Sequence, residues 1–138
     1  MFSIFIVEDE KLVSELLQDL LEDKGVDTNN IVICQDMAEL ITALESADSS
    51  RECLAICDNN FVGIPAINGS EALIGNAKNA IRLIREKYPE ALAIISSGDD
   101  KIPDDDAYEK LTKPYRQNQL DALLRRMGHK LQTANTDN

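Results

Sequence analysis

The sequence has little positive charge. Its 14 Lys and Arg residues stand against 25 Asp and Glu residues, so the formal net charge is −11. The electric field of such a surface repels polyanions, which disfavours binding to nucleic acid or to an anionic membrane. We therefore expect protein partners or cations. Histidine is scarce as well: the single His129 has no companion His or Cys, and we expect it on the surface rather than in a metal or phosphorelay site.

Long apolar runs and a cysteine framework are also missing. No apolar stretch approaches the ~20 residues that cross a bilayer. No basic-then-apolar leader with a small-residue cleavage site is present, so we expect a cytoplasmic protein. The three cysteines, Cys34, Cys53 and Cys57, are odd in number, lie within apolar runs and lack CxxC spacing. This pattern predicts reduced core residues rather than disulfides or metal ligands.

The apolar content that is present suffices for one core. With 138 residues, of which 43% are hydrophobic, the chain is long enough for one ordinary core and too short for two comfortable domains. We expect one domain over residues 1–131, followed by a frayed polar tail over 132–138.

Short apolar runs rich in β-forming residues alternate with segments of helical periodicity. The predicted strands are FSIFIV (2–7), IVICQ (31–35), ECLAIC (52–57), ALAIIS (91–96) and EKLT (109–112). Strands that alternate with helices predict a doubly wound α/β fold, because each parallel crossover needs a helix to return the chain. Ligands in such sheets bind outside the carboxyl ends of the strands.

Four helices are predicted between and after these strands. The first ends at Gly25, the second (37–47) has a capping box of Asp36 and Glu39, and the third (71–88) is capped by Ser70. The last covers residues 117–131, whereas the acidic segment after the fourth strand has room for a stub of helix at most. The apolar stripe expected on the first helix consists of Leu12, Leu16, Leu17, Leu20 and Leu21, and that of the third includes Leu73, Ala77, Ile81 and Ile84.

Polar residues follow four of the predicted strands. Glu8 and Asp9 follow the first, Asp58 the third, Ser96 or Ser97 ends the fourth, and Lys113 follows the fifth. Carboxylates that meet at one edge repel each other unless a hard divalent cation lies among them, and Mg²⁺ prefers such oxygen ligands. A metal, a lysine and a hydroxyl around one aspartate suit a phosphoryl group, with Asp58 as the attacking oxygen.

This arrangement resembles the receiver domains of two-component response regulators, of which the chemotaxis response regulator is the simplest form. The resemblance covers nearly the whole chain and rests on IVEDE, LAICD, IISSG and LTKPY, each at a strand end. It implies a five-stranded, flavodoxin-like sheet of order 2-1-3-4-5.

The resemblance also implies roles for individual residues. Asp58 would accept a phosphoryl group from the phosphohistidine of a histidine kinase or histidine phosphotransfer protein, and the protein would signal through contacts with a downstream protein. The remaining implied roles are metal binding by Asp9, Asp58 and the backbone carbonyl of Asn60, with Glu8 acting through water, and phosphoryl binding by Ser96 and Lys113. Ser97 is the alternative hydroxyl residue, and Ser96 is favoured because Ser97 before Gly98 fits the small position that follows it.

Three segments depart from the family pattern. Phe61 and Val62 stand where Met-Pro is usual and the following glycine, Gly69, comes late, so we expect a longer loop and an extended third helix. The stretch between Ser96 and Lys113 is short, which predicts a short or absent fourth helix. Lys110 replaces the switch aromatic, and nearby Tyr108 is the candidate substitute, with Ser96 as the other switch residue.

Three other functions compete with a phosphorylated receiver, which is not a conventional enzyme. A pseudo-receiver would keep the fold and the acids but bind partners without switching. A Mg²⁺-dependent phosphohydrolase is disfavoured, because Asn60 stands where a second aspartate would shuttle protons. Flavin or nucleotide binding is disfavoured because no Gly-rich loop follows the first strand.

Overall fold

The computed structural model describes residues 2–98, 105, 107–113, 118, 119, 121, 122 and 125. Five parallel strands form one sheet in the order β2-β1-β3-β4-β5, which confirms the predicted doubly wound, flavodoxin-like topology. The elements are β1 (Phe2–Val7), α1 (Lys11–Asp23), a 3-10 turn (Thr28–Asn30), β2 (Ile31–Cys34), α2 (Met37–Ser46), β3 (Glu52–Asp58), α3 (Ala77–Lys87), β4 (Leu92–Ser97) and β5 (Glu109–Thr112).

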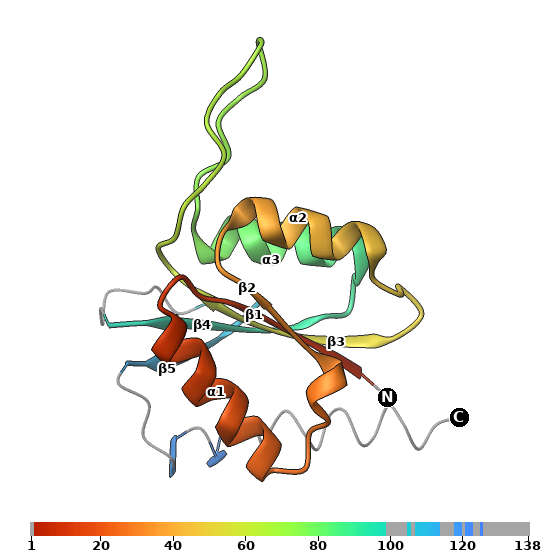
Figure 1. The fold of residues 1–138 in the computed structure, drawn as a ribbon, viewed down its shortest axis with the longest axis vertical. Coiled ribbons are helices and arrows are strands. Elements are labelled where there is room, and N and C mark those ends of the chain that lie inside the picture. Colours follow the sequence, from red (N-terminus) through yellow and green to blue (C-terminus); the bar gives the residue numbers. More distant parts are fainter. Residues whose placement is uncertain are drawn as a thin grey trace.

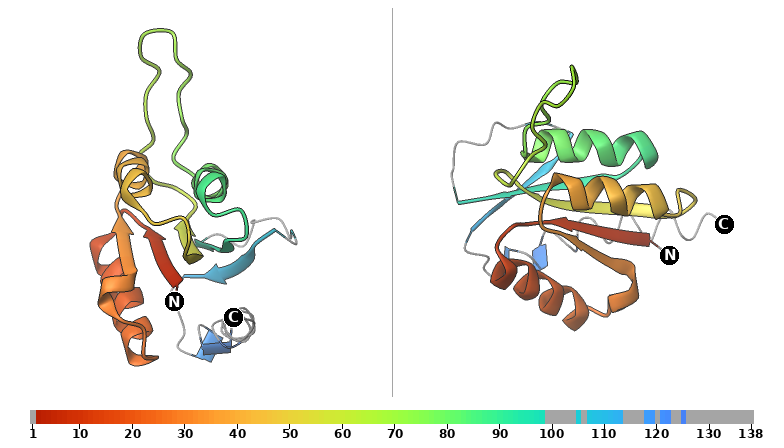
Figure 2. Two further views of the ribbon diagram at one scale, coloured as in Figure 1. Left: turned by 90° about the vertical axis from the view of Figure 1, so that its right-hand side faces the viewer. Right: turned by 45° about the horizontal axis from the view of Figure 1, so that its top comes forward.

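The helices cover both faces of this sheet. Helix α1 lies on one face, and α2 and α3 lie side by side on the other (Figures 1 and 2). Because successive side chains of a strand point to opposite faces, each strand supplies two cores. Ile4 and Ile6 of β1 pack with Leu17 and Leu21 of α1, whereas Phe5 lies in the core beneath α2 and α3.

Helix α1 ends where the sequence predicts. Gly25 has φ +92°, a conformation that glycine adopts without a steric penalty. Its N–H donates to the carbonyl of Glu22 at 2.9 Å, and the N–H of Val26 donates to the carbonyl of Leu21 at 3.1 Å. These two bonds form a Schellman motif that satisfies the last carbonyls of the helix.

The predicted apolar stripe of α1 is wrong for two leucines. Leu12 is 81% exposed and Leu16 is 45% exposed, whereas Ser14, Leu17 and Leu21 are buried. At 3.6 residues per turn the three buried residues share one face, and Leu12 and Leu16 lie on the opposite side of the helix. The sequence contains two possible apolar faces, and the sheet covers only one.

Helix α2 has the predicted cap. The Asp36 carboxylate accepts a hydrogen bond from the backbone N–H of Glu39 at 2.8 Å, and the Glu39 carboxylate accepts one from the N–H of Gln35 at 3.1 Å. These bonds satisfy donors at the start of the helix, so its first turn is defined by local sequence.

The third helix begins later than predicted. Ser70 does not cap it: α3 starts at Ala77, and the side chain of Asn76 accepts a hydrogen bond from the N–H of Asn79 at 2.9 Å. Leu73, which was expected on the helix, instead forms an antiparallel bridge with Ile64. The third helix is therefore not extended, and the inserted residues form a different structure.

Residues 61–75 form a hairpin that projects from the body, called the arm below. It rises beyond α2 and α3, with its two legs side by side in Figures 1 and 2. At the tip, the N–H of Ser70 donates to the carbonyl of Ile67 at 3.0 Å, across Asn68 (φ 53°) and Gly69 (φ 83°). Positive φ at both central residues is typical of a type I′ turn, for which Asn-Gly is a strong sequence signal.

The predicted core cysteines and part of the last predicted helix are confirmed, and several other predictions lie beyond the described residues. The three cysteines are free and buried, and no helix in the described part of the chain is long and apolar enough to cross a bilayer. Residues 118, 119, 121, 122 and 125 are helical, in agreement with the last predicted helix. The fourth-helix region, His129, the domain end at 131 and the tail lie largely or wholly outside the described residues.

Candidate functional site

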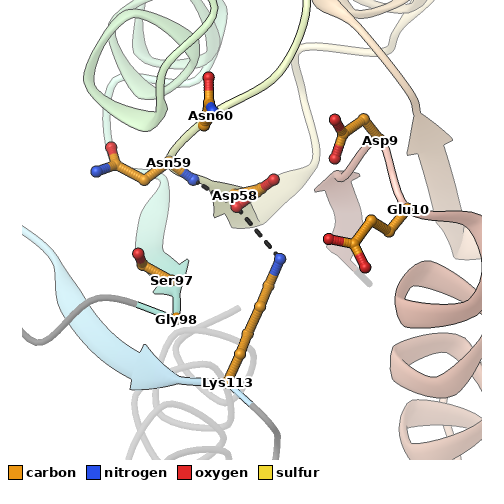
Figure 3. A pocket seen from close by; sticks show the side chains of 8 residues that line it. All are labelled: Asp9, Glu10, Asp58, Asn59, Asn60, Ser97, Gly98 and Lys113. Atoms are coloured by element: carbon orange, nitrogen blue, oxygen red, sulfur yellow. Dashed lines mark hydrogen bonds and ion pairs between the residues drawn. The ribbon is translucent and has the colours of Figure 1, made fainter.

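The carboxyl ends of β1, β3, β4 and β5 surround a cavity of about 490 Å³. Parallel strands bring their carboxyl ends to the same edge of the sheet, so residues far apart in sequence meet there. Figure 3 shows acidic side chains on one side of this cavity and Asp58 with Lys113 on the other. The lining residues are Asp9, Glu10, Asp58, Asn59, Asn60, Ser97, Gly98 and Lys113.

Asp58 is the last residue of β3 and is 9% exposed. Its Oδ1 accepts hydrogen bonds from the backbone N–H of Asn59 at 2.8 Å and from Lys113 Nζ at 3.2 Å. Burial raises the pKa of the Asp58 carboxyl above its ordinary value, because low-dielectric surroundings disfavour the charged form, although Lys113 and the Asn59 N–H act in the opposite direction. Both contacts use the same oxygen of the carboxylate.

Lys113 bridges two buried carboxylates. Its backbone N–H donates to the carbonyl of Ser97 at 2.9 Å, which fixes the position of the residue after β5. Its Nζ lies 2.7 Å from Glu8 Oε2 as well as 3.2 Å from Asp58 Oδ1. One ammonium therefore faces two carboxyl groups, and full ionisation of both would leave an uncompensated negative charge.

Glu8 is the most deeply buried acid of the site, with 1% exposure. The pKa of its carboxyl is raised from 4.5 to about 7, chiefly by burial and also by the charge of Asp58, while Lys113 and the N–H of Glu10 act in the opposite direction. The Glu10 N–H donates to Glu8 Oε1 at 3.2 Å. Glu8 is not among the residues that line the cavity, and lies behind it against Lys113.

The acids after β1 form a group that could hold a cation. One carboxylate oxygen from each of Glu8, Asp9 and Glu10 lies within 4.8 Å of the others. Asp58 and Asn60 line the same cavity and add a carboxylate and an amide oxygen to the groups that could bind a cation there. Hard divalent cations such as Mg²⁺ prefer this donor set, and the residues present therefore fit such an ion.

Glu10 was not predicted as part of the site. Glu10 occupies the N-cap position of α1, without a side-chain cap bond. It also lines the cavity beside Asp9. Its place in the acidic run "EDE" after a buried strand was the signal that could have identified it.

The two candidate hydroxyl residues occupy different places. Ser96 is paired with Asp58 in the β3–β4 register and is 1% exposed. Ser97 is the one that lines the cavity. Tyr108, the candidate switch aromatic, is outside the lining and packs half-buried against the core beneath α2 and α3.

Comparisons with known proteins place this geometry in context. No protein-family model matches the chain, and no curated protein matches it either. Solved structures, in contrast, match nearly the whole chain. The signal receiver domain of an HD domain-containing protein from Pseudomonas fluorescens Pf-5 matches with a TM-score of 0.69 and 18% identity, over 95% of this chain and 98% of that one.

Two further structures agree. Response regulator TrrA from Thermotoga maritima, solved in complex with Mg²⁺-BeF, has a TM-score of 0.65 and 22% identity, over 91% of this chain and 98% of that one. Chemotaxis protein CheY4 from Vibrio cholerae has a TM-score of 0.62 and 18% identity, with the same coverage of 91% and 98%. Because these similarities extend over nearly the whole chain, the protein has the fold of the response regulator receiver domains.

Proposed function

We propose that this protein is a phospho-accepting receiver of two-component signalling, in which Asp58 takes a phosphoryl group from a phosphohistidine. The observation that carries the proposal is the placement of a buried aspartate carboxylate at a strand end, within hydrogen-bond distance of Lys113 and across a cavity from Asp9 and Glu10. The donor would be a histidine kinase or a histidine phosphotransfer protein.

The chain's own residues suggest how the transfer proceeds. Lys113 and the Asn59 N–H both contact Oδ1, which leaves Oδ2 as the oxygen that attacks phosphorus. The Oδ2–phosphorus bond forms while the bond between phosphorus and the donor imidazole nitrogen breaks. Lys113 then turns its ammonium from the carboxylate to a phosphoryl oxygen, and the charge that develops there is stabilised electrostatically. The hydroxyl of Ser96, or that of Ser97 in the cavity wall, donates a hydrogen bond to the transferred phosphoryl group.

The acidic side of the cavity would hold Mg²⁺. Asp9, Asp58 and the backbone carbonyl of Asn60 are the proposed ligands, with Glu8 acting through water and Glu10 as a further carboxylate nearby. When bound, the ion supplies positive charge that offsets the repulsion between the carboxylates and the incoming phosphoryl group. Support comes from the oxygen-rich donor set and from the similar fold of TrrA, which was solved with Mg²⁺-BeF.

Phosphorylation by a small acyl phosphate tests the proposal. Intact mass spectrometry after incubation with Mg²⁺ should detect one added phosphoryl group on the wild type and none on Asp58→Asn. Asp19→Asn is the matched control, because Asp19 lies exposed on α1, and it should behave as the wild type. A wild type that never gains this mass, or an Asp58→Asn variant that does, would contradict the proposal.

A pseudo-receiver is the second candidate. It is favoured by Tyr108, which packs on the core instead of lining the cavity, and by Lys110 at the position expected for an aromatic switch. Such a protein would bind its partner equally well before and after incubation with the acyl phosphate. Its affinity would also be the same for the wild type and for Asp58→Asn.

A further inference from the structure

The arm (residues 61–75) is an ordered hairpin whose glycines are required by its geometry. Ile64 and Leu73 exchange two backbone hydrogen bonds of 2.8 Å. A Cβ on Gly63 would lie 2.2 Å from the carbonyl oxygen of Leu73, and a Cβ on Gly75 would lie 1.9 Å from that of Phe61. Real Cβ atoms do not approach backbone so closely, so only glycine lets the two legs meet at the base.

The base of the arm is fixed to the body. Phe61 is 6% exposed and belongs to the core beneath α2 and α3. The carbonyl of Val62 accepts a hydrogen bond from the N–H of Met37, the first residue of α2, at 3.0 Å. The side chain of Asn79 on α3 donates to the carbonyl of Ile74 at 2.9 Å. The arm is therefore held in one direction by both helices beneath it (Figure 2).

The arm exposes large apolar side chains near its base, at Val62 and Ile74, and beside its tip, at Ile67. Val62 is 68% exposed, Ile67 56% and Ile74 66%. Side chains alternate between the two faces of a hairpin, so Ile74 points away from the face on which Leu73 packs against the core. Only Glu71 is charged within the arm, although 28% of the whole chain is charged. A lone two-stranded hairpin is at best marginally stable in water, so a packing partner would complete this element.

We propose that the partner is a second copy of this chain, and that the protein dimerises by packing the two arms against each other. Two copies that each carry a net charge of −11 repel when their bodies approach. An extended leg of seven residues spans roughly 20 Å, whereas charges are screened within about 8 Å at physiological salt. Contact between the nearly neutral arms, which carry only Glu71 as a charged residue, therefore keeps the two acidic bodies beyond the range of their repulsion.

Charge also argues against an unlike partner at this element. A partner with a complementary, basic surface would be attracted to the acidic body and not to the nearly neutral arm. A neutral, apolar, projecting surface is complementary to itself, which is what a two-fold symmetric contact requires. This dimer does not depend on the chemistry proposed for Asp58.

Sedimentation equilibrium over a wide range of protein concentrations tests the dimer. The wild type should dimerise, and the double variant Ile67→Ser with Ile74→Ser should dissociate with a Kd at least roughly tenfold higher, because each dimer loses both side chains from both copies. Leu12→Ser is the control, since it removes from α1 a leucine that is even more exposed than Ile67 and Ile74. Its Kd should equal that of the wild type.

Two outcomes would overturn the proposal. One is a wild type that stays monomeric at every concentration; the other is a dimer whose Kd is unchanged in the arm variant or is raised by Leu12→Ser instead. Circular dichroism of each variant establishes that it is folded. Phosphorylation of the arm variant by the acyl phosphate should be unaffected, so the dimer and the proposed function can fail separately.

Discussion

Replacing Glu8 by Gln should stabilise the protein at neutral pH, even though it removes an ion pair of 2.7 Å. Burial raises the pKa of Glu8 from 4.5 to about 7 in the folded protein, so the folded state binds a proton more tightly than the unfolded chain does. Stability must then fall as the pH rises through this window, because the carboxylate is forced to ionise in a buried position.

The pKa shift of Glu8 sets the size of the stabilisation expected for Glu8→Gln. One pKa unit corresponds to about 1.4 kcal/mol, so a rise from 4.5 to about 7 corresponds to about 3 kcal/mol. Below pH 4.5 the Glu8 carboxyl is protonated and the amide of the variant is neutral, so the wild type and Glu8→Gln should have nearly equal stability. Above pH 7 the variant should be more stable by about that amount.

Urea unfolding of both proteins across this pH range, with a chelator to remove divalent cations, measures the difference. Only the difference between the two curves counts, because titration of other groups affects both proteins alike. Glu10→Gln is the control, because Glu10 is the exposed neighbouring glutamate. Its free energy of unfolding should stay closer to that of the wild type across the pH range than that of Glu8→Gln does. A stability difference that does not change with pH would refute the reasoning, as would a Glu8→Gln variant that is less stable at neutral pH.

Three further changes test the site and the arm. Lys113→Met should slow phosphorylation by a small acyl phosphate about a hundredfold or more, because it removes the charge that faces the transferring group; Lys110→Met is the control, and equal rates in the two variants would contradict this. Mg²⁺ at a hundredfold excess over its Kd should stabilise the wild type against unfolding by about 2.7 kcal/mol. Thermal unfolding of Asp9→Asn should show little of this stabilisation, and an undiminished stabilisation would show that Asp9 is not a ligand. Gly75→Ala should cost about 1–3 kcal/mol in urea unfolding because its Cβ overlaps backbone; Gly98→Ala, where a Cβ meets nothing within 4 Å, should cost less, and equal losses would count against the close approach.

The strand ends were predictable because they depend on local pattern plus one topological rule. Buried runs that stop at Glu8, Asp58 and Lys113 identify the ends of three strands, and parallel strands bring those ends to one edge. The caps at Asp36 and Gly25 were predictable for a similar reason: each is a short-range interaction between a side chain or glycine and the adjacent backbone. Neither depends on distant parts of the chain.

The arm shows where local pattern misleads. Leu73, Ala77 and Ile81 have helical spacing, and this pattern concealed the hairpin although Asn68-Gly69 is a recognised turn signal. A helix that began at Ser70 would have lost the backbone pairing of Leu73 with Ile64. The helix propensity of one segment contains no information about a backbone pairing with a distant residue, so it cannot predict that the pairing replaces the helix.

By itself the sequence determined the element order, the parallel sheet and the edge at which the acids gather, because these follow from hydrophobic periodicity and the handedness of crossovers. Only the tertiary structure decided that α1 buries Leu17 and leaves Leu12 exposed, that Lys113 pairs with Glu8 as well as Asp58, and that Ser97 lines the cavity. These outcomes depend on the rotation of a helix against the sheet and on distances of a few ångströms between residues distant in the chain, which no local pattern encodes.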